Sequence, residues 1–349
     1  MSGKSIRRAG KVSGIMLLFF MITLLLSGGP EIVKAAGTIT VTDSDGFEVE
    51  IEQPVEKIVC TSSAVNEILV ALGAGDKIIA RDEWSQVSAP LKDQEELPVV
   101  ASSSFRLQIE AIAELEPDIV IADTMLQEDA REKLEDFAIP AIGERTSKAD
   151  NLFSVIRRLA KIVDKKERGE ELIDFISEYR DLIKERVSEI NEEEKPRIYW
   201  EWREKYKSGN SSSTVQSRID LVGGINIAAD AEGKYPDLSS EFVIQENPEV
   251  IIRLESRGTS VKAMQKLWQE INTRTGLDQT AAVENERVYI LTQAINTGLP
   301  SIVGDLYFAK IAHPKLFADI DPQEVYSELV NEFFGVTVEE PLYFPEVER

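Results

Sequence analysis

Residues 109–122 read IEAIAELEPDIVIA, and residues 240–253 repeat the pattern as SEFVIQENPEVIIR. In both stretches a Glu lies seven residues before a Pro, an acidic residue follows the Pro, and a run of β-branched residues comes next. Such a stretch predicts a helix that ends at the Pro and is followed by a buried strand. Because the copies lie 131 residues apart, we expect two lobes built from the same unit.

The chain around these two stretches alternates in the same way. Residues 39–42 and 47–51 flank the turn DSDG and predict a hairpin. Further apolar runs are separated by helical stretches and lie at 57–61, 77–80, 118–122, 197–200, 249–252 and 287–291. Short strands that alternate with helices indicate a mostly parallel sheet. We therefore predict an α/β fold with two mostly parallel-sheet lobes, residues 37–150 and 196–349, each able to bury its own core.

Residues 151–195 form a helical segment of different character. Residues 151–194 contain no Pro and a single Gly, and apolar residues recur at helical spacing over 166–190. This spacing predicts one long amphipathic helix, about 37 Å in length, that bridges the lobes. A stiff connector of this kind would let the lobes twist slightly rather than close. A long helix packed inside one lobe is the alternative.

Residues 1–36 are predicted to be a signal peptide. Basic residues precede an apolar run at 15–26, and small residues surround Ala35. A run of 12 residues is too short to cross a bilayer, which needs about 20. We expect Sec-type cleavage near Ala35 and an extracytoplasmic protein, in the periplasm or on the outer face of the cell membrane. An uncleaved N-terminal anchor is the alternative.

Composition excludes several chemistries. The chain has 349 residues, a formal charge of −23, one His and one Cys. A single Cys excludes internal disulfides and Cys-rich zinc sites, and a single His excludes a multi-His metal site. An acidic chain repels phosphate backbones, so nucleic acid is not an expected partner. We expect no bound metal, no resident cofactor and a monomer, with Cys60 and His313 in structural roles.

The sequence resembles the class III substrate-binding proteins of ABC importers, which carry cobalamin, ferric siderophores or haem. The resemblance covers nearly all of the chain after the signal peptide. It rests on the two E-x6-P units, on DSDGFEVEIEQPVEKIVCTSSAVNEILVALGAGDKIIA at 43–80, on SGNSSSTVQSRIDLVGGINIAAD at 208–230 and on YPDLSSEFVIQENPEVII at 235–252. It implies two α/β lobes bridged by a long helix, with the ligand in the cleft between them.

The resemblance also implies a partner. In that family one Glu of each lobe docks onto arginines of the membrane permease dimer. Glu110 and Glu241 match those docking positions. From the repeat alone, both could instead be first-turn glutamates that the helix dipole favours.

Candidate ligand contacts follow from the strand pattern itself. In open α/β sheets, ligands bind beyond the carboxyl ends of the strands. Aromatic rings there would stack on a wide, flat chelate, and arginines would pair with its carboxylates, which leans mildly towards an anionic ferric complex. The predicted ligand-binding residues are Arg81, Trp84, Phe105, Arg106, Trp200, Trp202, Arg203, Tyr206, Tyr235, Arg253 and Gln293.

Some of these residues have a second interpretation. Trp200 belongs to a predicted strand and could point into the core. Arg203 and Arg253 could pair with Glu201 and Glu255 as ion pairs.

The sequence therefore predicts a receptor that captures an iron chelate, such as a siderophore or haem, or cobalamin and delivers it to a permease. No bond is broken, and the chain is not expected to be an enzyme. One alternative is a secreted enzyme that acts on a small anionic substrate with Asp82 and Glu201 as an acid/base pair. A sensor or adhesion protein that reuses the fold is the other.

Overall fold

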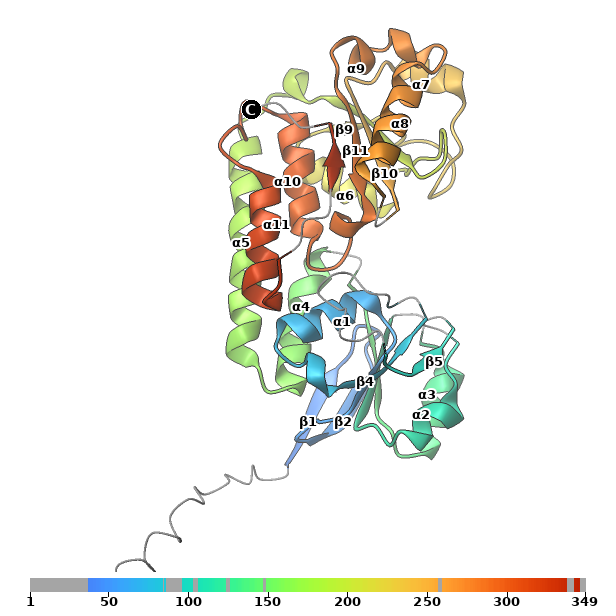
Figure 1. Cartoon of the computed structure of the whole chain (residues 1–349), viewed down its shortest axis with the longest axis vertical. Helices are drawn as coiled ribbons and strands as arrows, with labels where there is room; N and C mark the ends of the chain where they lie inside the picture. The colour runs from blue at the N-terminus through green and yellow to red at the C-terminus, as the bar shows by residue number, and fades with distance from the viewer. Residues whose placement is uncertain are drawn as a thin grey trace, which may run out of the picture. The chain divides into compact units, whose positions relative to one another are not determined.

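The fold is built around two five-stranded sheets, seen in a computed structural model that describes residues 37–83, 85, 96–102, 106–123, 126–146, 149–256, 259–337 and 342–345 (Figure 1). The predicted signal peptide lies outside these residues. One sheet has the order β5-β4-β3-β6-β7 and the other the order β12-β11-β10-β8-β9. Neighbouring strands pair in parallel except β11 and β12, which are antiparallel. The predicted α/β fold with mostly parallel sheets is confirmed.

The strands of the first lobe, the N lobe, are β3 (Ile58–Cys60), β4 (Ile78–Asp82), β5 (Val99–Ala101), β6 (Ile119–Asp123) and β7 (Ala141–Glu144). Those of the second, the C lobe, are β8 (Arg197–Trp202), β9 (Ile225–Asn226), β10 (Val250–Glu255), β11 (Val288–Thr292) and β12 (Tyr343–Phe344). The predicted hairpin forms a separate two-stranded sheet of β1 (Gly37–Thr42) and β2 (Glu48–Gln53).

The two large sheets share one topology. Strands β4, β3, β6 and β7 of one sheet correspond to β9, β8, β10 and β11 of the other. In each sheet the first strand, β3 or β8, has β4 or β9 on one side and the remaining two strands on the other side. One extra strand extends each sheet, β5 beside β4 and β12 beside β11. The repeat seen in the sequence is therefore a repeat of the fold.

The two E-x6-P units have the same local structure. Glu116 and Asn247, which directly precede the prolines, both adopt left-handed conformations, with φ of 49° and 42°. The acidic residue after each Pro binds the backbone at the start of the neighbouring strand's segment: Asp118 Oδ2 accepts from the Lys57 amide at 2.8 Å, and Glu249 Oε2 accepts from the Arg197 amide at 2.9 Å. The sharp turn at the Pro and these carboxylate hydrogen bonds together hold β6 against β3 in the N lobe and β10 against β8 in the C lobe.

Helices connect the strands. In the N lobe they are α1 (Ser63–Ala71), α2 (Ile109–Glu114) and α3 (Glu128–Asp136), and α4 (Ala149–Ile162) and α5 (Lys166–Val187) follow. In the C lobe they are α6 (Thr214–Leu221), α7 (Ser240–Glu246), α8 (Val261–Asn272), α9 (Ala281–Glu284), α10 (Ser301–Ala312) and α11 (Pro322–Phe334). Short 3-10 turns are η1 (Gly75–Lys77), η3 (Glu192–Glu194), η4 (Leu277–Gln279) and η5 (Gln293–Ile295).

The long helix α5 is present but ends earlier than predicted. It ends at Val187, whereas the apolar spacing predicted a helix to residue 190. Asn191 is extended (φ −75°, ψ 157°) and forms a capping box with Glu194, so the chain starts a new turn there. Helix α5 contacts both α4 and α10, which lie on the same side of it in the view of Figure 1.

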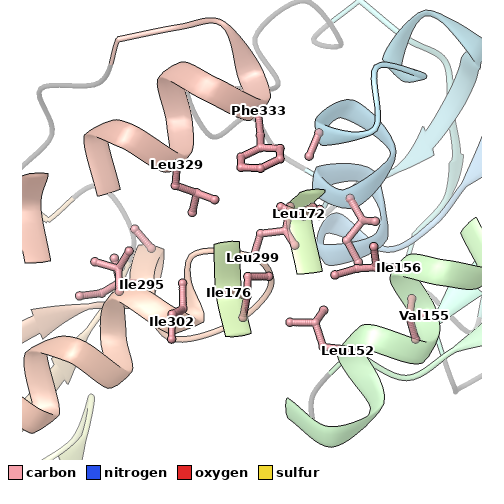
Figure 2. Packing of buried hydrophobic residues seen from close by; sticks show 14 of the residues in the cluster. Leu152, Val155, Ile156, Leu172, Ile176, Ile295, Leu299, Ile302, Leu329 and Phe333 are labelled. Carbon is pink, nitrogen blue, oxygen red and sulfur yellow. The ribbon is translucent and has the colours of Figure 1, made fainter. Parts of the chain in front are cut away.

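The main apolar cluster runs through both lobes, and each lobe also has a cluster of its own, around Val120 in the N lobe and around Ile251 in the C lobe. Residues 38–349 form one compact unit, and its main cluster includes Ile58 and Ile121 of one sheet together with Ile198 and Ile252 of the other. Figure 2 shows Leu152 of α4, Leu172 and Ile176 of α5 and Leu299 of the C lobe meeting in this core. Helix α11 also contacts α1 of the N lobe. The lobes are therefore joined by packing as well as by chain.

Candidate functional site

The topology places a candidate site at the carboxyl ends of both sheets. The order of strand addition reverses between β3 and β6 in the N lobe, and between β8 and β10 in the C lobe. Ligands of doubly wound sheets bind outside such switch points. Thr61 directly follows β3, and Trp202 is the last residue of β8.

Buried polar atoms without a hydrogen-bond partner in the protein gather near these strand ends. Thr61 Oγ1 and Ser85 Oγ follow β3 and β4, and Thr292 Oγ1 and Gln293 Oε1 lie where β11 ends. Most buried polar atoms in folded proteins are paired, so each of these groups calls for a partner, such as an ordered water or a ligand, that the protein itself does not supply. Further atoms of this kind are both amide atoms of Asn66, Trp200 Nε1 and the Tyr307 hydroxyl. All of these side chains are uncharged, and the Arg131 Nε atom of α3 is a further, charged example.

The lobes also approach each other closely at Gly298. Glu67 of α1 is 4% exposed. A Cβ atom built on Gly298, in the segment between η5 and α10, would lie 2.4 Å from Glu67 Oε2. Asn66 and Gln293, which carry unpartnered atoms, lie next to these two segments in the chain. The contact therefore brings the ends of α1 and β11 into one region.

Aromatic rings of the C lobe form a short column. The Trp202 ring lies 4.7 Å from Tyr235 at an angle of 40° and 6.2 Å from Trp200 at 14°. Trp202 and Tyr235 are half-buried. The Arg203 guanidinium is exposed and lies 5.8 Å from the Trp202 ring centroid. This Trp202–Tyr235 pair offers an apolar face of the kind that stacks on a flat ligand.

A buried ionic junction lies on the other face of β8. Glu201 is fully buried and binds Arg253 Nη1 at 2.7 Å and Arg274 Nη1 at 2.6 Å. Burial alone would raise the pKa of this carboxyl, but the hydrogen bonds from Arg274 and the charge of Arg253 outweigh it, so the pKa is lowered. An ionised carboxylate whose oxygens are all engaged is a poor proton acceptor, which argues against an acid/base pair of Asp82 and Glu201.

Three predicted ligand contacts are buried within the protein. Trp200 is 3% exposed and packs in the main core, as its alternative interpretation expected. Arg253 is 5% exposed, and its guanidinium donates to Glu201, Glu255 and the Arg203 carbonyl. Arg81 is 8% exposed and donates to the Asp82 carbonyl at 3.0 Å. These arginines hold the fold and present little surface to a ligand.

The other predicted contacts divide between two faces. Tyr206 packs with the cluster around Tyr199, across the sheet from Trp202, and its ring lies under the Arg274 guanidinium at 5.0 Å. It is therefore separated from the Trp202–Tyr235 pair. Gln293 is half-buried and Arg106 is exposed. Trp84 and Phe105 lie outside the described residues.

The two predicted docking glutamates are both exposed in the first turn of a short helix. Glu110 lies in α2 and Glu241 in α7. In Figure 1, α2 and α7 both lie on the side of the fold away from α5. The pKa of Glu241 is lowered by its own backbone amide and by the Ser240 hydroxyl, so this carboxyl is charged at neutral pH.

A separate hollow of about 980 Å³ lies where the C-lobe strands begin, near His313. The polar groups around it are already engaged: Arg186 pairs with Asp319 at 2.6 Å, and Arg287 donates to the last carbonyls of α10. The His313 ring nitrogen lies 2.9 Å from the Val222 carbonyl. This hollow therefore lacks the unpartnered groups found at the carboxyl ends of the sheets.

Two further searches concern the described part of the chain only. There, no group of three or more His, Cys, Asp or Glu side chains could hold a metal ion. Over the same residues, every helix is too short or too polar to cross a bilayer.

Comparison with known proteins identifies a matching family and several relatives. The model of the periplasmic binding protein family matches residues 58–295, more than half of the chain. A vitamin B12-binding protein of Vibrio parahaemolyticus is 29% identical over 201 residues, which cover 57% of this chain and 70% of that protein.

Solved structures share the fold. The TroA-like periplasmic binding protein FepB of Veillonella parvula superposes with a TM-score of 0.78 at 22% identity, over 88% of this chain and 99% of that one. The molybdate-binding protein MolA of Haemophilus influenzae gives 0.73 at 18% identity, over 87% and 100%.

Proposed function

The chain belongs to the periplasmic binding protein family, and from this premise we propose that it is the extracytoplasmic substrate-binding protein of an ABC importer. It captures a metal-containing small molecule between its lobes and delivers it to a permease. The observation that carries the proposal is the set of unpartnered buried polar atoms at the carboxyl ends of both sheets. A binding protein needs recognition groups on both lobes, and these atoms supply them.

The chemistry of the candidate site favours cobalamin over an anionic ferric chelate. Two arginines that would pair with an anion, Arg253 and Arg274, are buried and bound to carboxylates. The unpartnered groups near the strand ends are hydroxyls and a side-chain amide, which suit the amide-rich rim of a corrinoid, and the Trp202–Tyr235 pair suits its apolar face. The relative named as a vitamin B12-binding protein supports the same cargo. A ferric siderophore or haem is the alternative, since Arg203 stays exposed.

Binding tests the cargo directly. Isothermal titration with cobalamin, haem and a panel of ferric siderophores should give the tightest binding for cobalamin. Trp202→Phe should weaken binding, and Trp268→Phe should not, because Trp268 of α8 packs on Phe344 and donates to the Val288 carbonyl. Binding no tighter than about 100 μM for every compound, about 5.5 kcal/mol, would reject this class of cargo.

Delivery is assigned to Glu110 and Glu241, which would each meet a basic socket of the permease dimer. The double variant Glu110→Ala/Glu241→Ala should abolish uptake and leave cargo affinity intact. The matched control is Glu128→Ala/Glu324→Ala, because these are also exposed first-turn glutamates, in α3 and α11. Equal uptake by both double variants would reject the docking assignment. If the chain binds cargo but its removal leaves uptake of that cargo unchanged, a sensor function would be favoured.

A further inference from the structure

We propose that Glu201 is a positioning residue that holds the Trp202–Tyr235 pair in its cargo-binding arrangement from the opposite face of the sheet. The inference rests on the proposed function, because it assigns the pair to cargo binding. Glu201 itself is fully buried and touches no surface that a ligand could reach. It acts through the loop that follows β8.

Glu201 binds several polar groups beneath that loop. Its Oε1 accepts from the Tyr199 hydroxyl at 2.9 Å, the Tyr206 amide at 2.8 Å and Arg274 Nη1 at 2.6 Å. Its Oε2 accepts from Arg253 Nη1 at 2.7 Å and Arg274 Nη2 at 3.3 Å. One carboxylate thus joins two guanidinium groups to the backbone of the loop. An apolar side chain could fill this space but could not make these bonds.

The loop needs such an anchor because its backbone is strained. Arg203 and Tyr206 are both in left-handed conformations, with φ of 58° and 63°, and neither is Gly. Side chains other than Gly rarely adopt this conformation unless surrounding bonds hold it. Here Arg253 binds the Arg203 carbonyl, and Glu201 binds the Tyr206 amide. Each strained residue is therefore held by one member of the junction.

The same loop holds the second ring of the pair. The Tyr206 carbonyl accepts from the Leu238 amide at 2.9 Å, and the Ser208 amide donates to the Pro236 carbonyl at 3.0 Å. Tyr235 directly precedes this bonded segment. The Trp202 amide donates to the Lys207 carbonyl at 2.8 Å, so Trp202 belongs to the same arrangement. Release of Tyr206 would loosen both rings.

The first test needs no ligand. Near-ultraviolet circular dichroism reports fixed aromatic packing, and the part of the signal that Trp202→Phe removes reports Trp202. In Glu201→Gln this part should fall by about half or more, because fixed packing is what produces it. The matched control is Glu144→Gln, since Glu144 is also fully buried and bound to an arginine, Arg158, but lies in the N lobe. Its Trp202 signal should equal that of the unaltered chain.

The second test uses cobalamin. Glu201→Gln should weaken binding about tenfold, mainly through faster dissociation, because the loop and two rings must be ordered on binding. Glu144→Gln should bind like the unaltered chain. If Glu201→Gln does not fold, Arg274→Lys takes its place, with Arg158→Lys as control, because lysine keeps the charge and loses the forked contact.

The outcomes are separable. Equal Trp202 signals and equal affinities in the Glu201 and Glu144 variants would overturn the inference and leave Glu201 a purely structural residue. If the unaltered chain binds no cobalamin, the proposed cargo fails, and the circular dichroism comparison alone decides the positioning role.

Discussion

The close approach of Gly298 and Glu67 gives the sharpest test of the contact between the lobes. Gly298 has φ of +69°, and a Cβ atom there would lie 2.4 Å from Glu67 Oε2. Glu67 is 4% exposed, so its carboxylate has little room to turn away. Gly298→Ala should therefore strain the backbone and displace a buried carboxylate from the other lobe.

The size of the effect follows from these two costs. A left-handed conformation costs an alanine about 1–2 kcal/mol, and a displaced buried polar group costs about 1–3 kcal/mol. Gly298→Ala should thus lower the free energy of unfolding by about 2–4 kcal/mol, a value below the full sum because the Glu67 side chain can partly relax. Gly73 provides the control, because its φ is +72° and a Cβ atom there would meet nothing within 4 Å. Gly73→Ala should show the backbone cost alone.

Unfolding in urea, followed by linear extrapolation, measures both variants. A double-mutant cycle of Gly298→Ala with Glu67→Ala isolates the coupling, which should lie within about 0.5–3 kcal/mol. Equal destabilisation by Gly298→Ala and Gly73→Ala, with no coupling to Glu67, would show that the lobes do not press together at this point.

Three further predictions concern the whole chain and its rare side chains. Because one core joins the lobes, cobalamin should change the radius of gyration in small-angle scattering very little, and a large contraction would contradict the shared core. Burial, together with the charge of Arg287, lowers the pKa of His313, so the unfolded chain binds the proton more readily. The free energy of unfolding should therefore fall as pH drops below about 6.5. Urea unfolding of His313→Asn should show a smaller fall over the same range. Identical pH profiles for the variant and the unaltered chain would exclude His313 as the cause. Burial raises the pKa of the Cys60 thiol, so a thiol reagent such as DTNB should label it only after unfolding, and rapid labelling of the native protein would show that strand β3 opens.

The sequence predicts strands with continuous apolar runs well and the edge strands poorly. Strands β3, β6, β8, β10 and β11 carry β-branched or aromatic runs, which mark buried parallel strands. Strand β7 reads AIGE, and β9 and β12 have two residues each. Such segments form strands because an adjacent strand of the sheet offers hydrogen bonds. That strand is distant in the sequence, so the local residue pattern does not indicate it.

The candidate site shows the same limit. The aromatic residues Trp202 and Tyr235 stand out in the sequence because large rings at strand ends are unusual. The pairing of Arg253 with Glu201 and Glu255 was foreseen as an alternative, but the role of Arg274 was not, since it lies 73 residues from Glu201. Thr61, Asn66 and Thr292 were missed as well, because a Thr at the end of a strand or an Asn in a helix is common, and only burial without a partner distinguishes these three.

The last helix has a consequence for how the chain matures. Helix α11, Pro322–Phe334, covers part of α1, Ser63–Ala71, so a face of the N lobe is synthesised about 250 residues before its cover. Exposed apolar surface of this kind promotes aggregation during folding. The N lobe therefore gains this cover only after α11 has been synthesised, and a chain truncated before Pro322 should aggregate more readily than the longer one.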